Sequence, residues 1–268
     1  MAKPLVPDDL WVAIEPLLPR ERPKPKGGRP RLPDRAALTG ILFVLRSGLP
    51  WEMLPSEMGC GSGMSCWRRL RDWQEAGVWA ALHRALLERL QVAGQIDWRR
   101  AALDSASVPA KRGGAETGPN PTDRGKPGTK RHLVTDARGT PLGLILSGAN
   151  RHDSLMLAPT LDAIPPIRDG GRGRPRRRPD KLHADKAYDH RRCRRECRAR
   201  GVTPRIARRG VESSARLGRH RWVVERTFAW LARYRRLTIR YERRADIHLA
   251  FATLACALVC LGQIGRFC

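Results

Sequence analysis

Acidic side chains are scarce in this sequence of 268 residues, which holds 26 Asp and Glu against 52 Lys and Arg. The formal net charge at pH 7 is therefore +26. A chain this basic repels itself in the compact state unless a polyanion neutralises it. Because most of the basic side chains are arginines, which bind phosphate through paired N–H groups, the composition indicates nucleic acid as the partner, ahead of an anionic membrane.

Other absences narrow the class of protein further. The N-terminus MAKPLVPDDLW has no apolar run of the signal-peptide type, so we expect a chain that is not secreted. The seven cysteines are odd in number and unclustered, which favours reduced thiols in the cytoplasm over a disulfide framework. Only residues 247–264 form a long apolar run, and its alanines, His248 and Gln263 favour a buried C-terminal helix over a membrane span.

The N-terminal part of the chain, residues 1–95, is predicted to form an all-helical domain. Residues 34–48 and 78–94 have apolar side chains at helical spacing, and a shorter helix is expected from residue 8 to Pro19. Residues 19–33 are rich in Pro, Gly and basic side chains, so we expect them to form an extended arm.

Residues 50–77 are expected to form a short helix, a glycine-rich turn and a second helix. On the second helix the apolar face carries Trp67, Leu70 and Trp73, and the other faces carry the basic residues Arg68, Arg69 and Arg71. This arrangement resembles a helix-turn-helix whose second helix enters the major groove of DNA. A plain helical bundle with a solvated basic face explains the same pattern, and the sequence leaves both interpretations open.

The pattern changes after Gly94, and residues 96–268 are predicted to form an α/β domain. Strands are expected at 99–110, 132–136, 142–148, 181–189 and 202–209. Helices are expected at 156–164, 190–200, 220–236 and 247–264. This order predicts a mixed sheet flanked by helices.

Two aspartates lie in strand-like runs, where their short polar side chains are disfavoured. Asp104 is in AALDSAS and Asp185 is in KLHADKAYD. Glu225 is the only acidic side chain between Ser213 and Tyr241. Three carboxylates held together would raise each other's pKa, a penalty that divalent metals remove. The sequence therefore predicts that these three acids bind two Mg²⁺ ions for phosphodiester chemistry.

A plainer interpretation exists for each acid. Asp104 could cap a strand end, Asp185 could accept hydrogen bonds in a turn, and Glu225 could pair with Arg221 one helical turn earlier. Backbone contacts to DNA near the acids are predicted for four basic side chains: Lys130, Arg131, Arg221 and Arg226. The Arg-Pro segments at 27–31 and 172–176, the second of which contains Arg174, could lie in a minor groove or be solvated linkers.

Several of these motifs, taken in order, resemble one family. The segments are LDSASV, GPNPTDRGKPGTKRHLVTDARGTPL, HADKAYD and RWVVERTFAWLARYRRL. Together with PWEMLP and WRRLRDW nearer the N-terminus, they resemble the DDE transposases of bacterial insertion sequences, specifically the insertion-sequence-five family. The resemblance covers nearly the whole chain.

The resemblance implies an RNase H-like catalytic domain in which Asp104, Asp185 and Glu225 form the catalytic triad and bind Mg²⁺ or Mn²⁺. Such enzymes bind the terminal inverted repeats of double-stranded DNA, cleave there, and join the 3′ hydroxyl to target DNA. The resemblance also implies at least a dimer, acting on the nucleoid in a bacterial cytoplasm. In the family's helix signature a Tyr and a Lys stand where this sequence has Gly218 and Ala232.

Two other classes of function remain possible at this point. A non-catalytic DNA-binding protein would need only the helical domain and the basic arms, and its three acids would lie far apart. An RNase H-like nuclease without strand transfer would share the site and differ only in a DNA-joining assay.

Overall fold

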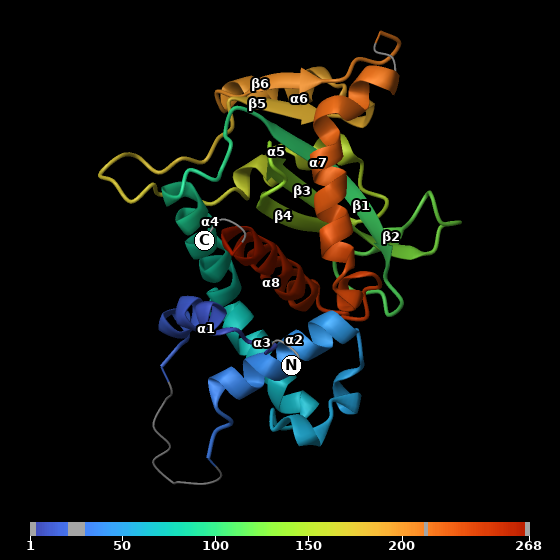
Figure 1. Cartoon of the computed structure of the whole chain (residues 1–268). Coiled ribbons are helices and arrows are strands. Elements are labelled where there is room, and N and C mark those ends of the chain that lie inside the picture. Colours follow the sequence, from blue (N-terminus) through green and yellow to red (C-terminus); the bar gives the residue numbers. More distant parts are fainter. Residues whose placement is uncertain (1–3, 21–29, 212–213, 266–268) are drawn as a thin grey trace.

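The computed structural model describes residues 4–20, 30–211 and 214–265 (Figure 1). Its first part is helical, as expected. The helices there are α1 (Asp8–Ile14), α2 (Asp34–Ser47), α3 (Gly63–Glu75) and α4 (Val78–Val92). α2 ends where predicted because Gly48 adopts a φ of 77°, a left-handed conformation that favours glycine.

The segment expected to be the first helix of a helix-turn-helix forms two single 3₁₀ turns instead, Trp51–Met53 and Ser56–Met58. Pro50 and Pro55 each precede one of these turns and lack the N–H that a longer helix would use. α3 buries Leu70 and Trp73, as its apolar spacing predicts, and leaves Arg68 exposed.

A mixed sheet of six strands forms the second part. Its strands are β1 (Ala101–Pro109), β2 (Gly118–Pro119), β3 (Pro127–Asp136), β4 (Pro141–Gly148), β5 (Lys181–Ala184) and β6 (Thr203–Ile206). β1 is antiparallel to β3, and β3 is antiparallel to β4. On its other side β1 is parallel to β5, which is parallel to β6. An antiparallel hairpin continued by parallel strands is the RNase H-like arrangement that the resemblance implies.

Three strands differ from their predicted lengths. One is β6, which spans Thr203–Ile206 where a strand at 202–209 was expected. β3 starts at Pro127, before the expected His132, because it pairs along the whole of β1, from Ala101 opposite Asp136 to Pro109 opposite Gly128. β5 ends at Ala184, where a 3₁₀ turn begins, so it is shorter than expected.

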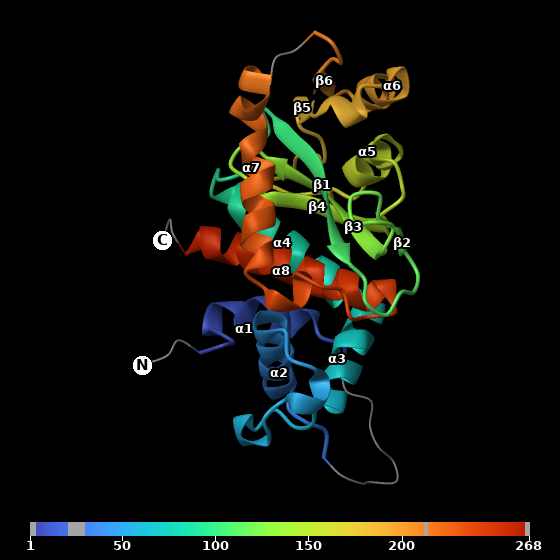
Figure 2. The same cartoon turned by 90° about the vertical axis from the view of Figure 1, so that its right-hand side faces the viewer.

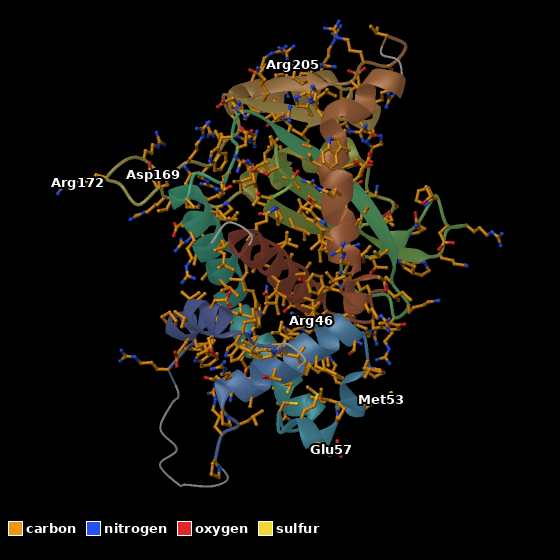
Figure 3. The ribbon with its side chains drawn as sticks, viewed as in Figure 1. Arg46, Met53, Glu57, Asp169, Arg172 and Arg205 are labelled. Carbon is orange, nitrogen blue, oxygen red and sulfur yellow. The ribbon has the colours of Figure 1, made fainter. Side chains whose placement is uncertain are left out.

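Helices cover both faces of the sheet. α5 (Asp153–Asp162) and α6 (Arg191–Ala199) lie on one face, and α7 (Ser214–Ala232) crosses the other (Figure 2). The long loop between α5 and β5 projects away from the sheet with Asp169 and Arg172 near its tip (Figure 3).

The last helix, α8 (Ala245–Ile264), lies between the sheet and the N-terminal helices (Figure 1). It is long and apolar enough to cross a membrane, but 67% of its apolar window is buried inside the protein. Phe251 and Cys256 in its middle are fully buried, in a core cluster that extends from the N-terminal helices to the sheet. This burial agrees with the expected core helix, while the division at residue 95 stays a prediction.

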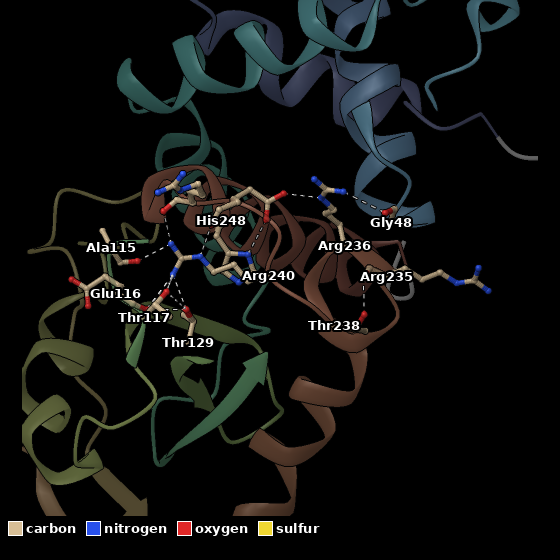
Figure 4. Close-up of polar contacts among 12 residues, drawn as sticks. Gly48, Ala115, Glu116, Thr117, Thr129, Arg235, Arg236, Thr238, Arg240 and His248 are labelled. Carbon is tan, nitrogen blue, oxygen red and sulfur yellow. Dashed lines mark hydrogen bonds and ion pairs between the residues drawn. The ribbon is translucent and has the colours of Figure 1, made fainter. Parts of the chain in front are cut away.

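Buried arginines tie the segment after α7 to both parts of the molecule (Figure 4). Arg240 is fully buried and donates hydrogen bonds to the Ala115 carbonyl at 2.7 Å and to Thr129 Oγ1 at 2.6 Å. Arg236 pairs with Glu242 at 2.7 Å and donates to the Leu49 carbonyl, beyond the end of α2, at 3.1 Å. These contacts hold both the loop before β2 and the end of α2 against one segment, residues 236–242, which follows α7.

Candidate active site

Asp104 lies in the middle of β1, the central strand of the sheet, and its side chain is 21% exposed. The Ser105 N–H donates to Asp104 Oδ1 at 2.8 Å, and Arg221 Nη2 on α7 donates to Oδ2 at 3.1 Å. Burial raises the pKa of Asp104, and the charge of Asp185 acts in the same direction, while Ser105 and Arg221 oppose the rise. Asp104 is thus a partly desolvated carboxylate within electrostatic reach of a second one.

Asp185 follows the last residue of β5 and lies beside Asp104. β5 is parallel to β1, and their pairing ends with Ala102 opposite His183. Asp104 and Asp185 each follow two residues later, and the charge of Asp185 acts on Asp104. Neighbouring strands lie about 4.8 Å apart, so the topology brings together two acids that are distant in the chain. Asp185 also accepts a hydrogen bond from the Ala187 N–H at 2.9 Å. The plain interpretation of Asp185 as a turn acceptor therefore holds together with its place at the site.

Glu225 is exposed on α7, one turn after Arg221. The plain interpretation pairs these two side chains, but Arg221 pairs with Asp104 instead. In the parts of the chain that the structure describes, Glu225 makes no ion pair. Side chains four positions apart share one face of a helix, so Glu225 lies on the same side of α7 as the arginine that meets β1.

Among the described residues, no three His, Cys, Asp or Glu side chains lie close enough to hold a metal ion. The described residues therefore show an electrostatic interaction between Asp104 and Asp185 but no assembled site of three acids. The donor chemistry nevertheless fits a hard divalent cation, since Mg²⁺ prefers carboxylate oxygens. The raised pKa of Asp104 shows that negative charge is unfavourable at this place, and a cation would relieve that cost.

Tyr188 is a neighbour of the acids that sequence reasoning did not identify. It is 1% exposed, and burial raises its pKa well above 10, with the charges of Asp153, Asp104 and Asp185 adding to the rise. Its position three residues after Asp185, in the 3₁₀ turn that this aspartate caps, is the signal that could have found it.

Three of the predicted DNA-contacting side chains, those of Arg131, Arg69 and Lys130, have little exposed surface. Arg131 is 4% exposed, and burial lowers its pKa to about 10. This conformation encloses the side chain, so its contact with DNA stays a prediction. Arg69 is 8% exposed and donates to the Leu32 carbonyl at 2.9 Å, so it holds the chain before α2 and does not face solvent. Lys130 is 13% exposed and pairs with Asp153 at 2.9 Å.

The other predicted contacts are placed differently. Arg226 donates to the Arg138 carbonyl and lies over two indole rings, Trp222 at 4.3 Å and Trp230 at 4.7 Å from the ring centroids. Arg71 pairs with its neighbour Asp72 at 2.7 Å. Arg68 and Arg174 are exposed, and their DNA contacts stay predictions.

The structure describes only part of the first Arg-Pro segment and all of the second. Residues 27–29 lie outside the described part of the chain. Arg31, which is described, lies 3.4 Å from Asp34. The segment 172–176 is mostly exposed in the loop between α5 and β5, and whether it enters a minor groove stays a prediction.

Two protein-family models match this sequence. Residues 6–83 match the model described as "Putative transposase of IS4/5 family", and residues 99–260 match the "Transposase DDE domain". The second match covers more than half of the chain and includes Asp104, Asp185 and Glu225.

Two relatives come from Burkholderia cepacia. The first, "Putative transposase for insertion sequence element IS402", is 55% identical over 168 residues, which are 63% of this chain and 77% of the relative. The second, "Insertion element IS402 uncharacterized 16.2 kDa protein", is 58% identical over 123 residues, which are 45% of this chain and 84% of the relative.

Among solved structures, a pre-cleavage Mos1 transpososome matches with a TM-score of 0.29 and 12% identity, covering 90% of this chain and 82% of the other. The Mos1 strand transfer complex matches with a TM-score of 0.27 and 12% identity, covering 90% and 81%. The family assignment rests on the sequence matches.

Proposed function

Because the chain belongs to the DDE transposases of the IS4/5 family of insertion sequences, we propose that it cleaves DNA at the element's inverted repeats and joins the 3′ hydroxyl to target DNA. The observation that supports the proposal best is the parallel pairing of β1 with β5 just before Asp104 and Asp185, together with the effect of the Asp185 charge on Asp104. A protein with net charge +26 is suited to draw a DNA backbone to these acids.

Asp104 and Asp185 are the proposed first ligands of Mg²⁺ or Mn²⁺, and Glu225 is the proposed third. Glu225 is chosen because it lies one turn from Arg221, which already contacts Asp104. When bound, a pair of divalent ions activates the attacking hydroxyl and stabilises the leaving oxygen. The Arg221 guanidinium beside Asp104 supplies positive charge at the same place in the structure.

The chain's own groups prepare this site. The Ser105 N–H holds one oxygen of Asp104, and the Ala187 N–H holds one oxygen of Asp185, so the orientation of both carboxylates is set by backbone donors. A carboxylate that is fixed before the substrate binds loses little conformational freedom in the reaction. The rigid strand β1 and the turn after β5 therefore favour a site formed in advance.

The test is Asp104→Asn, with Asp169→Asn in the exposed loop after α5 as the matched control. We expect Asp104→Asn to bind duplex DNA from the element's ends as the wild type does, and to lose Mg²⁺-dependent cleavage and joining at least a thousandfold. Gel assays of nicked and joined products measure this. Full cleavage by Asp104→Asn would refute the assignment of this carboxylate.

Two related proposals follow from the family. A nuclease without strand transfer would release cut ends and never join them to a target duplex, so the same gel assay separates it from a transposase. Joining both ends of an element requires two catalytic sites, which supports a dimer or a larger oligomer acting on double-stranded DNA. We place this activity in the bacterial cytoplasm, on the nucleoid.

A further inference from the structure

A basic pocket of about 380 Å³ lies where β5, β6, α6 and α7 meet. Four arginines line it, Arg194, Arg205, Arg208 and Arg221, together with His183 and His220. Burial lowers the pKa of His183 to about 4, so the positive charge of the pocket comes from the arginines. Among its described lining residues none is acidic. Figure 3 labels Arg205 on β6, at the end of the molecule that also holds α6 and the beginning of α7. A pocket lined in this way attracts anions.

The pocket adjoins the two aspartates. Arg221 lines it and at the same time donates to Asp104. Ala184 lines it as well, and it directly precedes Asp185. An anion in this pocket would therefore lie next to the carboxylates, separated from Asp104 by one guanidinium.

The basic side chains of the pocket are not equally available. Arg194 pairs with Asp189 at 2.6 Å and donates to the Ile206 carbonyl at 3.1 Å. Arg221 is paired with Asp104. Arg205 and Arg208 are exposed, and within the described residues neither makes an ion pair or a side-chain hydrogen bond. These two arginines therefore remain available for a ligand.

We propose that Arg205 and Arg208 bind a backbone phosphate of the cleaved DNA strand, next to the phosphate that reacts at Asp104 and Asp185. This inference rests on the proposed function and adds to it a subsite on β6. Small-molecule pockets measure about 300–1,000 Å³, so the volume suits a nucleotide unit of a strand better than a lone ion. Arginine binds phosphate through two parallel N–H groups, which would fix the strand's register.

The first experiment compares two double variants of the full chain. Arg205→Gln with Arg208→Gln removes the pocket's available charges, and Arg195→Gln with Arg198→Gln removes two exposed charges on α6 outside the pocket. Fluorescence anisotropy would measure binding of a labelled duplex from the element's end across a salt series. We expect the pocket variant to bind about tenfold more weakly, with a shallower salt dependence, and the α6 variant to change affinity less than threefold.

The second experiment locates the phosphate. Single methylphosphonates, which are uncharged, are placed at successive positions of the cleaved strand. For the wild type one position near the cleavage site should weaken binding, and for the pocket variant the same position should have no further effect, because the two changes remove one interaction. Additive losses at every position would overturn the proposal.

Free inorganic phosphate carries the same charged oxygens as a DNA backbone phosphate and is the alternative ligand for Arg205 and Arg208. Calorimetric titration with inorganic phosphate tests this source, and we expect no saturable binding below millimolar concentration. Tight binding of inorganic phosphate, together with unchanged DNA affinity in the pocket variant, would contradict the proposal that this pocket binds DNA.

Failure of this inference is distinct from failure of the proposed function. Asp104→Asn should keep the methylphosphonate effect, since the subsite binds DNA without the reaction. The pocket variant should raise the DNA concentration needed for half-maximal metal-dependent cleavage, whereas Asp104→Asn should lose cleavage at every DNA concentration.

Discussion

The arginines around α8 differ sharply from those at the end of the sheet near β6. Arg240 and Arg236 are buried among backbone carbonyls and Glu242, where they join the loop before β2, the turn after α7 and the end of α2. Arg205 and Arg208 are exposed and line the pocket that also contains Ala184 and Arg221. Net charge alone therefore does not mark a DNA-binding surface, because part of it holds the fold together.

The comparison also separates two environments for a charged group. Around Arg240 each N–H has a fixed acceptor, although burial still lowers the pKa of the guanidinium. Asp104 has one backbone donor and one arginine, and its pKa is raised despite both. An incompletely compensated carboxylate is typical of a functional site, whereas a fully bonded guanidinium is typical of a structural one.

The largest expected effect is on stability. Arg240→Met leaves the carbonyls of Ala115 and Glu242 without the side-chain donor that Arg240 provides, so we expect the free energy of unfolding to fall by about 3–5 kcal/mol. Urea denaturation followed by circular dichroism would measure it. The control is Arg243→Met, an exposed neighbour expected to stay within about 0.5 kcal/mol. Equal losses in the two variants would remove the distinction between buried and exposed arginines.

A smaller effect concerns pH. The folded pKa of Asp104 is raised by burial above its unfolded value, so the folded state holds this proton more tightly. The stability that this provides is complete below the unfolded pKa and is lost as pH rises through the folded pKa. Asp104→Asn should therefore melt at a higher temperature than the wild type at pH 7, and the gap should close toward pH 3. A constant gap across that range would contradict the raised pKa.

The smallest expected effects distinguish two predicted DNA contacts. Arg68→Gln, on the exposed face of α3, should weaken duplex binding a few-fold, lower its salt dependence and leave the melting temperature unchanged. Arg131→Met, in the core, should leave DNA binding unchanged and keep or raise stability, because the buried charge has little compensation. Anisotropy and thermal melting of both variants give a matched comparison. A binding loss for Arg131→Met would show that this side chain reaches DNA after all.

Local chemistry made several elements predictable. Helix α2 and its end at Gly48, the hairpin of β3 with β4, and the helix around Glu225 follow from apolar spacing and turn residues, which act over a few positions. Asp104 stood out because aspartate is disfavoured in a strand, and the structure does place it in β1.

Burial of individual basic residues was not predictable in the same way. Lys130, Arg131 and His132 are consecutive polar residues, and nothing in their order shows that Arg131 is enclosed near Cys256 of α8, a helix far along the chain. The ion-pair partner of Arg221 could not be predicted from the sequence either. Spacing favours Glu225 one turn away, yet the partly buried Asp104 binds it instead, because attraction is stronger where less water screens it.

The sequence by itself determined the basic character, the order of helices and strands, and the acids suited to metal chemistry, since these depend on residue type and short-range spacing. Only the tertiary structure decided that β5 pairs with β1 in the register that sets Asp185 beside Asp104, and that Arg205 and Arg208 surround a pocket at that place. Strand register and burial arise from contacts between distant segments, and a linear pattern does not specify which segments meet.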